Sequence, residues 1–180
     1  MKYLKIPIER IGVLIGHKGE TKQALEEKTG IKINIDSKLG EITIEDNDTK
    51  DPLMLIKLEN FINAIGRGFS PQNAIQLFDD NADFFIFNLQ DYVGKKDAHI
   101  RRLKSRVIGK EGKTRKVLEE LTDSKISIYG HTVSIISDVV RMNVLKKSID
   151  MILQGSKQAT VYHFVEVQMK ELRREERYGF

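Results

Sequence analysis

The sequence contains no cysteine, so neither a disulfide framework nor a thiolate metal site is possible in it. It also has no apolar run approaching the roughly 20 residues that a membrane-spanning helix requires. The first five residues, Met1 to Lys5, lack the long apolar segment of a secretory signal. We therefore expect a cytoplasmic protein without a membrane segment.

Sequence signatures of several enzyme classes are missing as well. There is no Walker loop, no GxGxxG dinucleotide motif and no thiol nucleophile. The four histidines, His17, His99, His131 and His163, are scattered, with no pair at metal-ligand spacing. The acidic run 79–83 is the one candidate for a metal-dependent nuclease, but no further ligands are spaced to complete a shell, and a polar turn is the better interpretation. We expect no enzyme activity, no cofactor and no bound metal.

Basic residues are present in modest excess and are unevenly distributed. The net charge is +4 and the pI is near 9.1, which by itself is only a mild pointer to an acidic partner. Residues 101–116, however, carry eight Lys or Arg against a single acid, Glu111. Such clustering is typical of a phosphate-binding surface. On charge alone, a solvated helix face explains it equally well.

The chain repeats itself after 93 residues. Residues 14–35 read LIGHKGETKQALEEKTGIKINI, and residues 107–128 read VIGKEGKTRKVLEELTDSKISI. Eleven of these 22 positions are identical, without a gap. The period is much longer than that of a solenoid repeat. Two copies of one domain are therefore the better interpretation.

Each copy has the same expected order: strand, helix, GxxG, helix, strand, strand, helix. The assignment follows alternating apolar residues for strands, 3.6-residue periodicity for helices, and Gly, Asp and Pro at the ends. In the first copy the expected elements are a strand at 3–8, helices at 9–15 and 21–29, a hairpin at 31–44 and a helix at 53–65. In the second they are a strand at 84–89, helices at 97–108 and 113–121, a hairpin at 126–135 and a helix at 138–153.

The expected domain boundaries follow from this order. We assign residues 1–68 to the first domain and 84–180 to the second, which has a C-terminal helical extension. Residues 69–83 are expected to form a linker with a short helix at 71–78. Ser70 would cap this helix and Pro71 would occupy its first position.

The two GxxG segments, Ile15-Gly16-His17-Lys18-Gly19 and Ile108-Gly109-Lys110-Glu111-Gly112, resemble the signature of the KH domain. A lone GxxG is weak evidence, but each copy here lies within the full order of elements. That order resembles the type I KH fold. The resemblance implies an α+β protein of two type I KH domains, each a three-stranded antiparallel sheet packed on helices.

Nearly the whole chain resembles archaeal KH proteins related to the eukaryotic "partner of NOB" ribosome-assembly factor. The segments that carry this resemblance are 66–71, 109–115 and 160–164. It implies a non-catalytic role in small-subunit ribosome biogenesis, with binding to single-stranded rRNA near the 3′ end. It also implies association with other assembly or processing factors, such as a maturation endonuclease and an rRNA dimethyltransferase.

The physics of a GxxG loop explains why it suits RNA. Glycine has no Cβ to hold a nucleotide backbone away, and the next helix begins with free N–H groups that favour phosphate. KH modules clamp about four nucleotides in this way. We expect the lysines and arginines near each loop to contact phosphates and the isoleucines to offer an apolar platform to bases. The candidate residues are Ile15, Gly16, His17, Lys18, Gly19, Lys22, Lys32, Arg106, Ile108, Gly109, Lys110, Glu111, Gly112, Lys113, Arg115, Lys116 and Lys125.

Simpler roles compete with some of these assignments. Ile15 and Ile108 can be core residues, and Glu111 can favour the helix N-terminus instead of contacting RNA. The glutamate pairs 26–27 and 119–120 are expected to be solvated helix faces. Two other functions also fit the sequence, namely a general binder of single-stranded RNA or DNA and a protein-docking scaffold. Because basic charge is denser around the second GxxG, we expect that copy to dominate RNA affinity.

Overall fold

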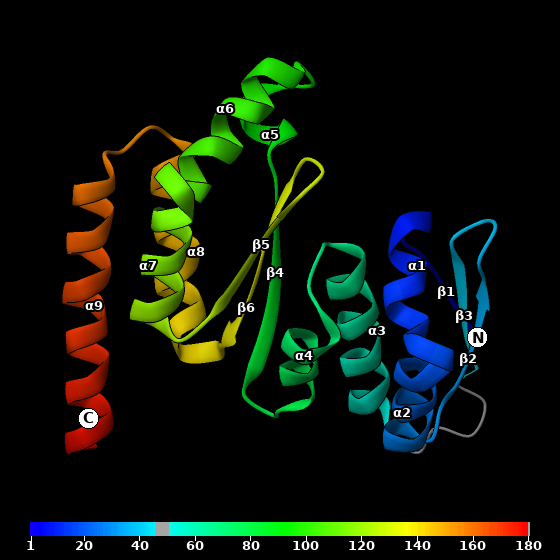
Figure 1. The fold of residues 1–180 in the computed structure, drawn as a ribbon. Coiled ribbons are helices and arrows are strands. Elements are labelled where there is room, and N and C mark those ends of the chain that lie inside the picture. The colour runs from blue at the N-terminus through cyan, green and yellow to red at the C-terminus, as the bar shows by residue number, and fades with distance from the viewer. Residues whose placement is uncertain (46–50, 180) are drawn as a thin grey trace. The chain divides into compact units, whose positions relative to one another are not determined.

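The computed structural model describes residues 1–45 and 51–179 and divides into two compact units, Met1–Asp80 and Asn81–Phe180. Each unit has one three-stranded antiparallel sheet with helices packed on it (Figure 1). This confirms the two copies of one domain that the repeat predicts and the α+β class that the resemblance to KH domains implies. No helix in the described parts of the chain is both long enough and apolar enough to cross a membrane.

The first unit has the sheet order β1-β3-β2. Leu4 pairs with Ile42, and Ile33 pairs with Ile44, so the isoleucines of the hairpin line one face. The elements are β1 (Lys2–Lys5), α1 (Ile8–Ile15), α2 (Glu20–Thr29), β2 (Lys32–Asp36), β3 (Glu41–Glu45), α3 (Pro52–Gly66) and α4 (Pro71–Ala74), with 3₁₀ turns at His17–Gly19 and Ile75–Phe78.

The second unit repeats the arrangement with the sheet order β4-β6-β5. Its long helices lie over one face of this sheet, and a further helix follows them (Figure 1). The elements are β4 (Ala82–Asn88), α5 (Gln90–Val93), α6 (Asp97–Ile108), α7 (Lys113–Thr122), β5 (Lys125–Tyr129), β6 (Thr132–Asp138), α8 (Val139–Leu153) and α9 (Gln158–Tyr178), with a 3₁₀ turn at Lys110–Gly112.

Local chemistry sets the ends of the helices. Asp51 caps α3 by accepting a hydrogen bond from the N–H of Leu53 at 2.9 Å, and Pro52 takes the first helical position. Asp138 caps α8 in the same way through the N–H of Arg141 at 2.8 Å. The first strand ends at Lys5, earlier than expected, because Pro7 has no N–H for a sheet ladder and precedes the start of α1.

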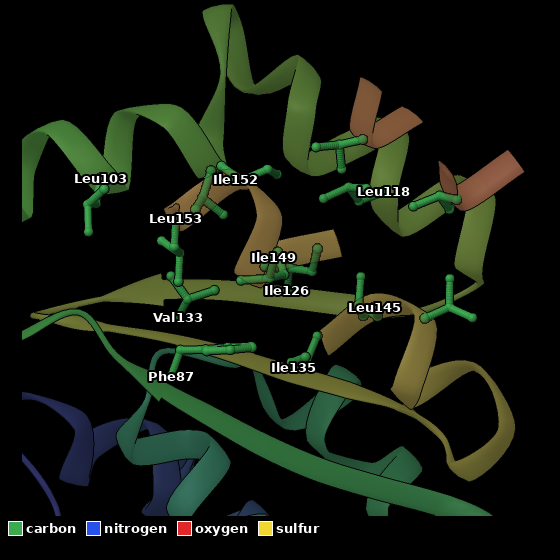
Figure 2. Close-up of a cluster of buried hydrophobic side chains, with 14 of the residues drawn as sticks. Phe87, Leu103, Leu118, Ile126, Val133, Ile135, Leu145, Ile149, Ile152 and Leu153 are labelled. Atoms are coloured by element: carbon green, nitrogen blue, oxygen red, sulfur yellow. The ribbon is translucent and has the colours of Figure 1, made fainter. Parts of the chain in front are cut away.

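The core of the second unit lies between its sheet and its helices. Figure 2 shows Leu118, Ile149 and Ile152 from the helices above Ile126 and Val133 from the sheet. The side chains of this core are buried to at least nine tenths, which removes a continuous apolar surface from water. Its members extend to Val161, Val165 and Met169, so α9 is part of the core.

Residues 69–80, which belong to the segment expected to be a linker, pack on the first unit. Ser70 caps α4 as expected, but the helix continues only as a 3₁₀ turn to Phe78. Lys57 on α3 donates from Nζ to the carbonyl of Phe78 at 2.9 Å and to Asp80 Oδ1 at 2.5 Å. The hydrogen bond from Lys57 holds the pKa of the Asp80 carboxyl below its usual range. The division between the two units falls within the acidic run 79–83, after Asp80.

Candidate nucleic-acid interface

Both GxxG loops adopt the same unusual backbone. Gly16 has φ 77° and ψ 178°, and Gly109 has φ 75° and ψ 175°. Gly19 and Gly112 lie in the left-handed region, with φ of 84° and 75°. Residues other than glycine rarely adopt these backbone angles. The glycines of the motif are therefore fixed by the backbone path of each loop.

The first glycine of each loop is also packed tightly. A Cβ at Gly16 would lie 2.8 Å from the backbone N of Thr21, and one at Gly109 would lie 2.7 Å from that of Thr114, with the threonine hydroxyls closer still. The first glycine therefore seats the loop against the following helix, through a threonine that both copies share.

The second glycine faces open space. A Cβ at Gly19 or Gly112 would meet no atom within 4 Å. Each of these glycines directly precedes a helix, α2 or α7, and no side chain caps the first turn of either helix. A phosphate can therefore approach the loop backbone and the helix N–H groups at the same place.

The residue before that glycine is strained in both loops. Lys18 has φ 51° and Glu111 has φ 53°, although neither is glycine. Left-handed backbone costs such residues about 1–2 kcal/mol. Strain of this kind concentrates at functional sites, where the surrounding structure enforces it. His17, Lys18, Lys110 and Glu111 are all exposed.

Around the second loop, the structure gathers several of the candidate residues. Lys110, Glu111, Lys113 and Lys116 line one open hollow of about 500 Å³, together with Val117 and Glu120. The three lysines are exposed. In the first copy, the positions equivalent to Lys110, Lys113 and Lys116 are His17, Glu20 and Gln23, none of which is a lysine. The second loop therefore has the stronger positive field.

The remaining candidates occupy different surroundings. Ile15 and Ile108 end α1 and α6 and are half-buried beside the loops. Lys32 and Lys125 begin β2 and β5, the outer strands of the two sheets. Arg106 points elsewhere, since its guanidinium donates to the carbonyl of Ser156 at 2.8 Å and so ties α6 to the turn before α9.

Two glutamates have a role that the sequence interpretation missed. Glu26 Oε1 accepts a hydrogen bond from the N–H of Ile33 at 2.8 Å, and Glu119 Oε1 accepts one from the N–H of Ile126 at the same distance. The expectation that Glu26 and Glu119 only form solvated helix faces is therefore wrong. Their identity in both copies is the signal that could have revealed this role.

Each of these carboxylates also lies near a candidate phosphate ligand. Lys22 Nζ is 3.6 Å from Glu26 Oε1, and Arg115 Nε is 3.9 Å from Glu119 Oε2. The glutamate thus connects the helix after the loop to the outer strand of the sheet.

We expect Glu119→Ala to lower the free energy of unfolding of the second unit by about 1–2 kcal/mol, because the N–H of Ile126 loses its acceptor. Urea denaturation followed by circular dichroism measures the change. The matched control is Glu120→Ala, which removes an exposed neighbour and should change stability by less than about 0.5 kcal/mol. Equal effects of the two substitutions would contradict the structural role of Glu119.

Tyr162 on α9 is a further residue near the second loop. Its hydroxyl donates to Thr114 Oγ1 at 3.1 Å, and Thr114 is the residue that packs on Gly109. The C-terminal helix α9 therefore contacts the residue on which the second GxxG loop packs. Among the described residues, no group of three His, Asp or Glu side chains could hold a metal ion.

Comparison with known proteins agrees with this geometry. The family model of the eukaryotic-type KH domain (type I) matches residues 83–170, and the KH domain model matches residues 1–50. A KH domain-containing protein of Methanocaldococcus jannaschii is 41% identical over 175 residues, which cover 97% of this chain and 76% of that protein.

Two further relatives carry more specific names. A chain in the crystal structure of the a/eIF2α–aDim2p–rRNA complex from Pyrococcus horikoshii has a TM-score of 0.86 and 39% identity, with 94% of both chains covered. The pre-rRNA-processing protein PNO1 of Saccharomyces cerevisiae is 26% identical over 136 residues, which cover 75% of this chain and half of that longer protein. With two KH folds, two intact GxxG loops and these relatives, the chain belongs to the family of tandem KH-domain proteins that includes PNO1 and Dim2p.

Proposed function

We propose that this protein is a non-catalytic RNA-binding factor of small-subunit ribosome biogenesis that holds single-stranded rRNA near the 3′ end through its GxxG loops. The relatives support the biological context, since one is named for pre-rRNA processing and another was crystallised with rRNA. The structure supports the molecular role, which is to bind and position a strand.

The observation that carries this proposal is the second loop. Its backbone is open at Gly112, it leads into a helix without a side-chain cap, and three exposed lysines surround it. An open glycine admits the sugar-phosphate chain, while the lysines neutralise phosphates and release counterions. These contacts fix the position of the strand, whereas the groove beside β5 would read the bases.

A binding titration tests the proposal. The probe is a fluorescent RNA of about 12 nucleotides from the 3′ end of small-subunit rRNA, long enough for two modules that each hold about four nucleotides. We expect it to bind at least about tenfold more tightly than a shuffled RNA of the same composition, a difference of about 1.4 kcal/mol.

Three outcomes would overturn the proposal. Equal affinity for the shuffled RNA would leave only general single-strand binding, and equal affinity for the matching DNA would remove the preference for RNA. Cleavage of the probe in magnesium, abolished by EDTA, would contradict the non-catalytic role. Crosslinking in cells, followed by sequencing of the bound RNA, locates the site independently of the chosen probe.

A further inference from the structure

The helix that leads into the second loop, α6, carries basic side chains outside the set of candidate RNA-binding residues. Arg101 and Arg102 are exposed, and Lys104 is half-buried. Lys95 and Lys96, which precede the helix, are exposed as well. One end of α6 meets the GxxG loop, and the other lies beside α5 (Figure 1). The cations therefore continue the positive charge away from the loop.

These five side chains are not used within the protein. Among the described residues, none of them forms an ion pair or donates a side-chain hydrogen bond. Two neighbouring arginines differ, since Arg106 donates to the carbonyl of Ser156 and Arg115 faces Glu119. Exposed like charges without internal partners repel one another and produce a positive potential that attracts an anion.

Two of the cations share a side of α6 with Ile108, which is expected to contact a base. Each residue of a helix turns by about 100°, so Arg101 lies about 20° and Lys104 about 40° from Ile108 around the axis. These two residues form the basic stripe of α6. Arg102 lies about 120° away from Ile108. Arg106 lies about 160° away, which agrees with its contact to the turn before α9.

The first copy has no equivalent of the basic stripe. Counting back from its GxxG loop, Ile8 and Ile11 take the positions of Arg101 and Lys104. The helix α1 has eight residues, whereas α6 has twelve. The basic residue of α1, Arg10, donates to two backbone carbonyls of its own unit. The longer helix and its cations are therefore an addition of the second unit.

The stripe extends over the length of a short piece of strand. With a rise of about 1.5 Å per residue, Lys104 lies about 6 Å and Arg101 about 10 Å from Ile108 along the helix. Successive phosphates of a stacked strand advance by about 3.4 Å, so the stripe can meet about two or three of them. Asp97 shares this side of α6, but the cations outnumber it.

We propose that Arg101 and Lys104 extend the RNA site of the second unit beyond the roughly four nucleotides of a KH groove. They hold phosphates of the flanking strand along α6, and Lys95 and Lys96 continue this surface. The inference rests on the RNA-binding function proposed above. Because the ligand is the sugar-phosphate backbone, this part of the site adds affinity without reading sequence.

Two adjacent arginines provide a matched test. The full chain is titrated with the rRNA probe of about 12 nucleotides at about 0.15 M salt, where exposed charges more than about 8 Å apart are screened. We expect Arg101→Gln to weaken binding about threefold to tenfold, and Arg102→Gln less than about twofold, although each removes one exposed charge. Adding Lys104→Gln to Arg101→Gln should bring the loss to at least about tenfold.

Salt dependence and RNA length locate the contact. Between about 50 and 200 mM salt, Arg101→Gln should reduce the slope of log affinity against log salt by about 0.7, the value for one phosphate contact of a single strand. Shortening the RNA from one end, down to about four nucleotides, should remove the difference between Arg101→Gln and the unsubstituted protein. Replacing Lys110 and Glu111 by aspartate should still weaken binding of the shortest RNA.

Controls separate charge from folding. Glutamine is a good helix former, so thermal unfolding of both variants should match that of the unsubstituted protein. Arg101→Lys keeps the cation and should bind RNA more tightly than Arg101→Gln.

Equal RNA affinity of Arg101→Gln and Arg102→Gln would overturn the extension. So would an effect of Arg101→Gln that persists on the shortest RNA, because Arg101 would then act at the loop itself. If the aspartates at Lys110 and Glu111 weaken binding while Arg101→Gln does not, the RNA-binding function stands and only the extension falls. If no RNA binds, both fall.

Discussion

Replacing Lys110 and Glu111 by aspartate is expected to weaken RNA binding about tenfold to a hundredfold, whereas replacing His17 and Lys18 by aspartate should weaken it only a few-fold. The reason is the distribution of positive charge. The second loop lies among Lys113, Lys116 and Arg115, so an RNA phosphate placed there meets several cations. Aspartates in the loop would oppose them at the point of closest approach.

Comparing the two double substitutions is informative because the change in net charge alone would favour the opposite order of effects on RNA affinity. With histidine neutral, replacing His17 and Lys18 by aspartate changes the charge of the first loop from +1 to −2, a change of −3. Replacing Lys110 and Glu111 changes the charge of the second loop from 0 to −2, a change of −2. If overall charge alone decided RNA affinity, the substitution of His17 and Lys18 would weaken binding more. A titration at fixed salt that gives this result would refute the dominance of the second module.

Gly109→Ala is expected to destabilise the second unit by about 3 kcal/mol or more. The new methyl group would lie 2.7 Å from the backbone N of Thr114, and the residue would keep φ at 75°. Overpacking costs about 1–3 kcal/mol, and a backbone conformation reserved for glycine costs a similar amount. Because one of the clashing atoms belongs to the backbone, shortening the Thr114 side chain as well should not restore stability.

Gly112→Ala is the matched control for that substitution. Its φ is also 75°, but its Cβ would meet no atom within 4 Å. Only the backbone penalty of about 1–2 kcal/mol remains. Thermal unfolding followed by circular dichroism distinguishes the two variants. If Gly109→Ala were no less stable than Gly112→Ala, the packing of the loop against Thr114 would not limit stability.

The repeat, read from the sequence, predicts the fold and the two loops well. Periodicity, capping residues and the GxxG spacing are local properties, and they recur 93 residues apart, so each copy supports the other. The same comparison located the four glycines of the loops, and all four have positive φ in the structure. Whether each candidate residue contacts RNA stays a prediction.

Contacts between distant residues were not predictable from these local signals. Glu119 reaches the N–H of Ile126 across the end of a helix, and Arg106 turns to the carbonyl of Ser156, 50 residues away. An apolar groove beside α2 is lined by Leu25, Phe61 and Ile75, which come from separate elements. The sequence periodicity does not show that these residues meet. The end of α7 also differs from its copy, since Asp123 adopts φ 47° where the first copy has Gly30.

The strained position between the two glycines has a consequence for how the modules can diverge. Nearly the same backbone carries lysine at position 18 and glutamate at position 111, both exposed to solvent. Reversal of charge at this point therefore leaves the loop conformation intact. Substitutions at this position can therefore change the RNA affinity of one module without changing that of the other module, while both modules keep their fold.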